Sequence, residues 1–269
     1  MIRFRRLLVS AALSLPVLLS GCASRTTASP QADPAVRQAL APTGTLRVGV
    51  YPGSPTSLVR NPNTGAAAGV ALDLGRALGE RLGVPVRVVE YSRLALVLDA
   101  LKTGALDFTF TNATEARERD MVFTPPLLRL ELGYLVPARP GIADVADVDR
   151  RPNRVGVTEG SSSQGVLTRT YAQALVVPVA SIKLGQSMLV QGTLDAFATN
   201  KAILFEMSDE LPGFRVLEGR WGVENLAIAI PMGREAAMPY LVQFAEGVKS
   251  SGVLGLAVAR SGLRGIANP

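Results

Sequence analysis

The chain has 269 residues, with 28 basic and 22 acidic side chains, no histidine and one cysteine. This length allows one or two domains with a sizeable core, and 48% apolar with 19% charged residues is typical of a folded globular protein. The lack of histidine excludes a Ser-His-Asp triad and an imidazole metal site, and a single cysteine excludes an intramolecular disulfide or a thiolate zinc cluster. We therefore expect neither a metal nor a cofactor.

Residues 1–21 have the pattern of an export signal. Three arginines at positions 3, 5 and 6 precede the apolar run Leu7–Leu19, which is shorter than the roughly 20 residues of a spanning helix. Cys22 follows Ser20-Gly21, and this arrangement resembles the lipobox of bacterial lipoproteins. The resemblance implies that 1–21 is a lipoprotein signal peptide and that Cys22 carries a lipid, which anchors the protein in the periplasm or cell envelope. The alternative is a soluble exported protein with an incidental cysteine.

The positive charge falls once this signal is removed. Residues 1–21 hold three arginines and no acid, so 25 basic and 22 acidic groups remain. The remaining arginines alternate with acids, as in Arg117-Glu118-Arg119-Asp120, whereas a nucleic-acid site needs clustered basic residues. We expect no nucleic-acid partner.

Residues 22–43 are rich in Ser, Thr, Ala and Pro, which predicts a flexible tether. The folded body is expected to begin at Gly44. Alternating and four-residue apolar periods then predict a strand, a helix, a strand, a helix and a strand, at 46–50, 70–82, 86–91, 94–104 and 106–111. This order favours a parallel sheet with helical crossovers.

A similar order returns in the second half. Strands are predicted at 154–158, 176–179 and 194–199, and helices at 164–174, 186–191, 200–207, 240–248 and 253–259. The extended segments Leu127–Val136 and Leu226–Ile230 are suited to crossing between two lobes. We expect lobe 1 to comprise 44–131 and 226–269, lobe 2 to comprise 132–225, and ligand to bind in the cleft at the carboxyl ends of both sheets.

Several segments carry a resemblance to a known family: Gly44–Val50, Gly69–Leu74, Leu101–Asp107, Thr114–Thr124, Val155–Ser162 and Gly192–Ala196. Their order and spacing resemble the type II periplasmic binding proteins, and more narrowly the extracellular solute-binding proteins of family 3, which serve amino-acid ABC importers. The resemblance implies an α/β fold of two lobes, each a mostly parallel sheet flanked by helices, with two crossing strands as hinge. It also implies a monomer.

The resemblance assigns a carboxylate-binding role to Arg117, which stands six residues before Phe123. A guanidinium suits this role because its planar fork donates two parallel hydrogen bonds. The alternative is a surface ion pair with Asp120 or Glu118. Asn112 stands where the family has a Thr or Ser ligand contact, and its alternative role is a loop cap.

Gly160-Ser161-Ser162-Ser163 follows a strand and opens a helix. Backbone N–H groups and hydroxyls therefore meet at the positive end of a helix dipole, where Ser161 and Ser162 can contact a carboxylate. The alternative is ordinary helix capping, for which serine is a preferred residue.

The chain departs from the family at several positions. Asn200 replaces the aspartate that pairs with a ligand ammonium, and an amide supplies no charge; its alternative role is an N-cap. Ser54 and Ser57 replace aromatic residues, with Tyr51 as a candidate substitute, and Ala71 replaces an acid. These departures favour a carboxylate ligand without an amine, because burial of an unpaired ammonium is costly.

Two residues before the return crossing are further candidates. Trp221 would supply an aromatic wall of the cleft, or instead a structural anchor. Glu224 would restore the negative charge that is missing at Asn200.

The leading hypothesis is a non-enzymatic, lipid-anchored solute-binding protein for an ABC permease in the inner membrane. Its ligand would be a small carboxylate-bearing solute, either amino-acid-like or a related organic acid. One alternative is an enzyme on the same scaffold, resembling the periplasmic cyclohexadienyl dehydratases, with Glu224 as general acid. Another is a ligand-sensing domain for a membrane partner.

Overall fold

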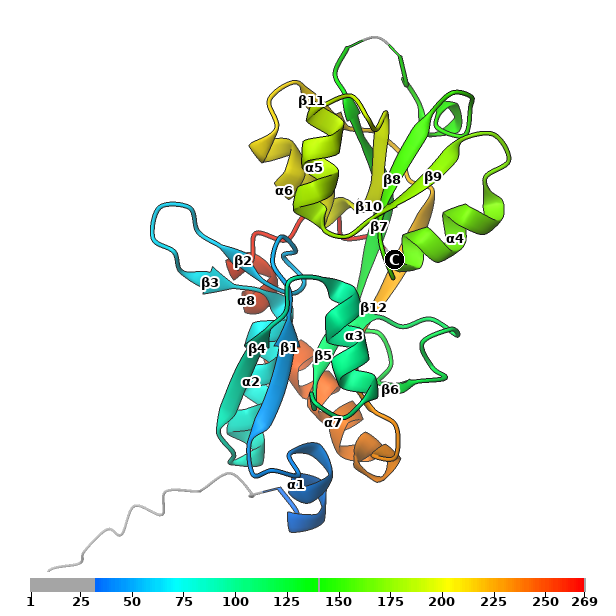
Figure 1. Ribbon diagram of the computed structural model, residues 1–269. Coiled ribbons are helices and arrows are strands. Elements are labelled where there is room, and N and C mark those ends of the chain that lie inside the picture. The colour runs from blue at the N-terminus through cyan, green and yellow to red at the C-terminus, as the bar shows by residue number, and fades with distance from the viewer. Residues whose placement is uncertain (1–31, 140, 269) are drawn as a thin grey trace, which may run out of the picture. The chain divides into compact units, whose positions relative to one another are not determined.

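Two groups of strands and helices are joined by a pair of long strands (Figure 1). The structure is a computed structural model that describes residues 32–139 and 141–268. The predicted signal peptide 1–21 and Cys22 lie outside the described residues.

Lobe 1 is the group that contains the first strands of the chain. It has strands β1 (Leu46–Val50), β4 (Val86–Glu90), β5 (Thr109–Asn112) and β6 (Met121–Phe123), and helices α1 (Pro34–Leu40), α2 (Val70–Leu82), α3 (Leu94–Lys102), α7 (Met238–Ser250) and α8 (Val253–Arg260). A short hairpin of β2 (Val59–Arg60) and β3 (Ala67–Ala68) lies at its edge. Helix α2 has the predicted bounds, because its four-residue apolar period is buried and Gly83 ends it in the left-handed conformation.

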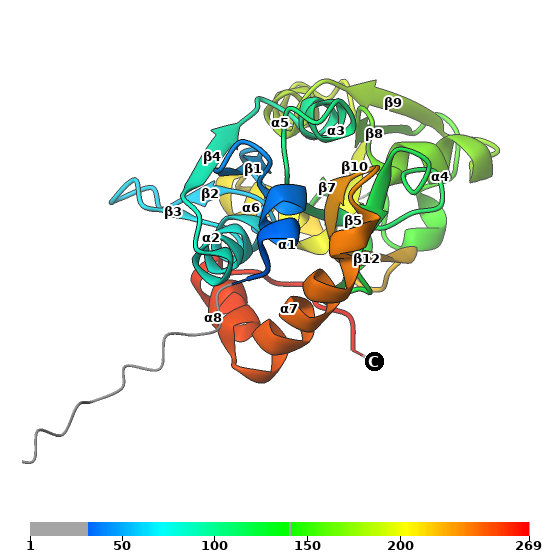
Figure 2. The ribbon, with the colours of Figure 1, turned by 90° about the horizontal axis from the view of Figure 1, so that it is seen from below.

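The tether prediction for 22–43 is wrong for its second half. Asp33 caps helix α1 by accepting a hydrogen bond from the Ala35 N–H at 2.8 Å, and Leu40 is fully buried in the core of lobe 1. The Asp33-Pro34 pair is a helix-start signal that the Ala- and Pro-rich composition conceals. Figure 2 looks onto this end of the molecule, with α1 toward the viewer.

Lobe 2 is the group formed by the middle of the chain. It has strands β8 (Arg154–Thr158), β9 (Leu175–Val179), β10 (Ala196–Asn200) and β11 (Phe214–Val216), and helices α4 (Ser162–Thr170), α5 (Ile182–Val190) and α6 (Lys201–Glu210). The predicted order of elements is confirmed, although α5 begins four residues before the predicted start at Gln186. Ser181 caps it by accepting from the Leu184 N–H.

The crossing strands are β7 (Leu128–Pro137) and β12 (Gly222–Pro231), which pair antiparallel with each other. β12 continues into lobe 1 beside β5 and β6, and β7 continues into lobe 2 beside β10 and β11. Neighbours β1–β4, β10–β8 and β8–β9 are parallel, and the crossing strands add antiparallel neighbours, with β12 between β5 and β6 and β7 between β10 and β11. The two-lobed fold with two crossing strands is therefore as predicted. The return strand begins four residues earlier than predicted.

The two lobes share a sequence pattern. Arg47-Val-Gly-Val50 in β1 returns as Arg154-Val-Gly-Val157 in β8, and 101–112 matches 189–200 at Leu, Gly, Leu, Asp, Thr and Asn. In each lobe the arginine of the first segment forms an ion pair with the aspartate of the second, and the two ion pairs have the same hydrogen bonds. The backbone N–H and Nε of Arg47 donate to Asp107 Oδ2 at 2.8 Å each, and those of Arg154 donate to Asp195 Oδ2 at 2.8 and 2.9 Å.

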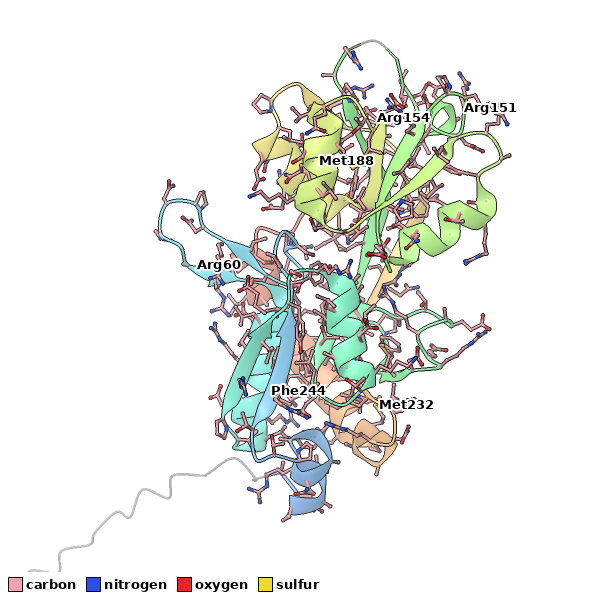
Figure 3. The ribbon with its side chains drawn as sticks, viewed as in Figure 1. Arg60, Arg151, Arg154, Met188, Met232 and Phe244 are labelled. Carbon is pink, nitrogen blue, oxygen red and sulfur yellow. The ribbon has the colours of Figure 1, made fainter. Side chains whose placement is uncertain are left out.

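Each arginine lies at the start of its strand, β1 or β8. Figure 3 labels Arg154 at the outer end of lobe 2. The two lobes are thus built on one plan. Sequence reasoning did not detect the repeat because unequal stretches separate its halves: the Arg–Asp pairs are 60 residues apart in lobe 1 and 41 in lobe 2.

One glycine of this pattern is required by packing in each lobe. A Cβ on Gly49 would overlap Leu106, and a Cβ on Gly156 would overlap Leu194 and Phe197. We expect Gly49→Ala and Gly156→Ala each to lower the free energy of unfolding by about 1–3 kcal/mol, the usual cost of overpacking a core. The measurement is chemical denaturation.

The control for these variants is Gly255→Ala. Gly255 is exposed in helix α8, and a Cβ there meets no heavy atom within 4 Å. This variant should be neutral or slightly stabilising, because alanine favours a helix over glycine. Unchanged stability of both core variants would contradict the packing argument.

Candidate functional site

Strands of both lobes point their carboxyl ends at a cavity of about 30 Å³, room for roughly one water molecule. Seven of the eight predicted ligand contacts line it: Tyr51, Asn112, Arg117, Ser161, Ser162, Asn200 and Glu224. The structure therefore brings together residues that lie up to 173 positions apart in the sequence, from Tyr51 to Glu224.

Arg117 places its guanidinium in the cleft and donates only to neutral acceptors. One terminal nitrogen donates to the Thr111 hydroxyl at 2.9 Å and to the Asn112 carbonyl at 3.0 Å, and the other donates to the Gly160 carbonyl of lobe 2 at 3.3 Å. Burial lowers the pKa of Arg117, an effect opposed by the negative charge of Glu224. A partly desolvated cation of this kind can bind a carboxylate.

The alternative role for Arg117, a surface ion pair, is not observed. Within residues 32–139 and 141–268 no ion pair joins Arg117 to Glu118 or Asp120, and Asp120 instead pairs with Lys102 at 2.7 Å. The guanidinium is thus available to a ligand anion.

Glu224 supplies the carboxylate of the cavity. It lies on β12, is 7% exposed, and accepts hydrogen bonds from the Ser162 hydroxyl at 2.8 Å and from Asn200 Nδ2 at 3.0 Å. The other end of the Asn200 amide accepts from the Ile203 N–H at 3.1 Å, so Asn200 also caps helix α6. Glu224 therefore supplies, in contact with Asn200, the negative charge that position 200 lacks.

The remaining lining residues are positioned by local hydrogen bonds. Asn112 Oδ1 accepts from the Asn225 N–H at 2.9 Å, which ties β5 to β12, and Ser161 caps α4 by accepting from the Gln164 N–H at 3.1 Å. Burial raises the pKa of Tyr51, so its hydroxyl stays neutral in the cleft. The Tyr51 N–H donates to Ser57 Oγ at 2.8 Å, which shows that Ser57 shapes the first loop from within.

Trp221 does not line the cavity, and the prediction that it walls the cleft is wrong. Its Nε1 donates to the Gly133 carbonyl at 3.0 Å, and its ring packs 6.1 Å from the ring of Tyr134 in lobe 2. The alternative role as a structural anchor describes this residue. The reason is its place one residue before β12, beside the core of lobe 2.

Besides Thr56 in the first loop, sequence reasoning missed three threonines at strand ends that line the cavity, Thr111, Thr158 and Thr199. Each occupies one of the last two positions of its strand, β5, β8 or β10. The signal that could have found two of them is the repeated Thr-Asn pair at 111–112 and 199–200, which stands at equivalent places in the two lobes.

Two larger chambers adjoin the small cavity on different sides. One, of about 680 Å³, shares Tyr51, Leu94, Thr158 and Ile182 with it. The other, of about 650 Å³, shares Arg117, Ser161 and Ser162. Arg93 of lobe 1, which lines the chamber of about 680 Å³, donates to Glu159 of lobe 2 at 2.5 Å. The lobes therefore touch across the cleft by side-chain contacts.

In the part of the chain that the structure describes, no three Cys, Asp or Glu side chains are grouped so that they could hold a metal ion. None of the helices assigned there combines the length and the apolar character needed to cross a membrane.

Two lobes, two crossing strands and a polar cavity at facing strand ends define a two-lobed periplasmic binding-protein fold. The model of the bacterial extracellular solute-binding proteins, family 3, matches residues 46–253. The chain belongs to this family.

Three curated relatives are similar in sequence. The chain is 26% identical over 203 residues to the membrane-bound lytic murein transglycosylase F of Shewanella sp. (strain W3-18-1), covering 70% of this chain and 40% of that protein. It is 23% identical to the glutamine-binding protein of Geobacillus stearothermophilus, with 63% and 66% covered, and 21% identical to the ABC transporter glutamine-binding protein GlnH of Bacillus subtilis (strain 168), with 72% of each covered. The chain thus spans under half of the transglycosylase.

Solved structures show the same fold. A solute receptor for L-cysteine of Neisseria gonorrhoeae has 21% identity and a TM-score of 0.74, with 84% of this chain and 92% of that chain covered. An ancestral arginine-binding protein bound to glutamine has 24% identity and a TM-score of 0.70, with 80% and 96% covered. The ancestral amino acid-binding protein AncCDT-1, a precursor of cyclohexadienyl dehydratase, has 22% and 0.70, with 81% and 95% covered.

Proposed function

We propose that this protein binds the zwitterion of an α-amino acid in the cleft and delivers it to an ABC importer without chemical change. The observation that carries the proposal is the presence of a cation and an anion on one small cavity. Among the residues that the structure describes, Arg117 donates only to neutral acceptors and Glu224 accepts only from neutral donors. A ligand with a carboxylate and an ammonium would satisfy both charges.

This proposal replaces the amine-free ligand that the sequence favours. That expectation depends on the neutral Asn200, but Asn200 donates to the Glu224 carboxylate at 3.0 Å. The negative charge needed by an ammonium is thus supplied from β12.

The cavity of about 30 Å³ is too small for an amino acid, so binding requires the lobes to part. Opening would break the contact of Arg117 with the Gly160 carbonyl and free one face of the guanidinium. Ser162 at the start of α4 would then offer its backbone N–H to the same carboxylate, whereas the Ser161 N–H already donates to the Thr158 carbonyl at 3.0 Å.

The test is calorimetric titration of purified protein that has been unfolded and refolded to remove retained ligand. We expect amino acids to bind and the matching 2-hydroxy acids and decarboxylated amines to bind at least about 30-fold more weakly, because each leaves one buried charge unpaired at a cost of about 2–5 kcal/mol. Binding of a hydroxy acid as tight as that of its amino acid would contradict the role of Glu224. Absence of binding by every amino acid would overturn the proposal.

We also propose that the protein is exported and held at the membrane by a lipid on Cys22. The support is the lipobox-like Leu19-Ser20-Gly21-Cys22 after a basic and apolar start. The mass of the mature N-terminus tests this, since a diacylglyceryl group adds a large apolar mass to Cys22. An N-terminus with an unmodified cysteine would overturn it.

An enzymatic function is the competing proposal, because Glu224 is a buried acid with two hydrogen-bond donors in the cleft. The named family relatives that match along most of their length are binding proteins, which favours binding without turnover. Incubation of the same protein with prephenate or arogenate distinguishes the two. Sustained product formation that Glu224→Gln abolishes would establish the enzyme.

A further inference from the structure

We infer that the amino acid bound by this protein has a large apolar side chain, which lies in the chamber of about 680 Å³ beyond Tyr51 and Ile182. The inference rests on the proposed function, because it starts from the positions of the ligand's two charged groups. It adds the class of amino acid and the place of the side chain.

The first step is the direction of the side chain. Arg117 and Ser161 line both the small cavity and the chamber of about 650 Å³, so a carboxylate bound there occupies that wall. An ammonium at Glu224 fixes the second substituent of the ligand's Cα. The remaining open wall is the one formed by Tyr51 and Ile182, which lies toward the other chamber.

The second step is the chemistry of that chamber. Apolar side chains form much of its lining, among them Leu94 and Ile182, which it shares with the small cavity. Leu58 and Met207 also line it, but at 2% and 1% exposure they offer little surface. Val59 on β2 continues this surface toward the rim. A volume of about 680 Å³ is within the range of sites that enclose small organic molecules.

The third step is that most of the charged groups of the rim already have partners, whereas Lys183, which has none among the described residues, is exposed. Arg60, on the β2–β3 hairpin (Figure 3), pairs with Glu90 at 2.5 Å, and Glu210 accepts from Gln186 at 2.9 Å. A charged ligand side chain would compete with these contacts. An apolar one would cover Val59, Leu94 and Ile182 without disturbing them.

The opposite chamber differs in its lining. Lys102, Arg119 and Asp120 are among its residues, and it opens beside the exposed 114–120 loop. It therefore suits water and counter-ions better than an apolar group.

The experiment is titration of the refolded protein with glycine, alanine, leucine, phenylalanine and tryptophan. We expect the three large apolar amino acids to bind about 10- to 100-fold more tightly than glycine, the range that corresponds to burial of one such side chain. Equal affinity for glycine and for all three large amino acids would overturn the inference while leaving the proposed function intact. Failure of every amino acid to bind would overturn both.

Two variants locate the side chain. Val59→Asp, at a half-buried position, and Met207→Ala should each weaken binding of the preferred large amino acid about 10-fold and leave glycine binding unchanged. Val190→Asp is the matched control, because Val190 is 63% exposed and lies outside the chamber. Thermal unfolding identifies a variant that fails to fold. If Met207→Ala does not fold, Val59→Asp still tests the inference. Unchanged binding in folded Val59→Asp protein would place the side chain elsewhere and overturn the inference.

Discussion

Glu224→Gln is expected to weaken amino-acid binding between about 30-fold and several thousand-fold, which corresponds to about 2–5 kcal/mol. The glutamine side chain has nearly the same shape and can still accept a hydrogen bond from Ser162, but it has no charge for the ligand ammonium. Calorimetric titration measures the loss. Glu218→Gln is the control, because Glu218 is exposed and does not line the cavity.

A second change makes this prediction sharper. Asn200→Asp in the Glu224→Gln background moves the carboxylate to a neighbouring position, and aspartate remains a good N-cap for α6. We expect the double variant to recover most of the lost affinity. If Glu224→Gln binds as tightly as the unchanged protein, the ammonium is not held by Glu224.

Asp107→Ala is expected to lower the free energy of unfolding by about 3–5 kcal/mol, the usual cost of removing one partner from a buried ionic cluster. Asp107 is fully buried and accepts from Arg47 through three groups, and from Arg234 at 2.8 Å. Its loss leaves two cations without their shared anion. Denaturant unfolding measures the effect, with unchanged ligand affinity as evidence that the cavity is intact.

The equivalent residue of lobe 2 provides a built-in comparison. Asp195 makes the same contacts with Arg154, but its side chain is 29% exposed and, among the described residues, no second arginine forms an ion pair with it. Asp195→Ala should therefore cost clearly less than Asp107→Ala. Equal losses would mean that the difference in burial has no energetic effect.

A fall in pH should weaken the Arg154–Asp195 ion pair of lobe 2. Burial tends to raise the pKa of Asp195, but the hydrogen bonds from Arg154 outweigh it and the net pKa is lowered from its ordinary value of 3.8. The resulting stability is present above pH 3.8 and is lost as the pH falls through the lowered pKa.

The sequence predicts the regular parts of this fold well because each has a local cause. The apolar period of α2 and the left-handed glycine at 83 specify a helix without reference to the rest of the chain. Helix α1 was missed because its stability comes from burial of Leu40 against lobe 1, which composition does not reveal.

Site residues could be predicted from the sequence only where a motif indicates the position of a strand end. Arg117 and Ser162 lie in segments whose spacing indicates the strand ends. Glu224 and Trp221 stand three residues apart, yet one faces the cavity and the other packs into lobe 2. That difference depends on where β12 begins, and no local pattern in the sequence marks this start.

The position of Glu224 on a crossing strand has a consequence for the order of events in binding. Arg117 belongs to lobe 1 and Ser162 to lobe 2, so their separation changes when the lobes turn, whereas Glu224 lies on the ribbon about which they turn. The amine should therefore dock while the protein is still open, and the carboxylate should be gripped last. The ligand would then bind first through its amine at the crossing strands, and its carboxylate would be enclosed afterwards as the lobes close.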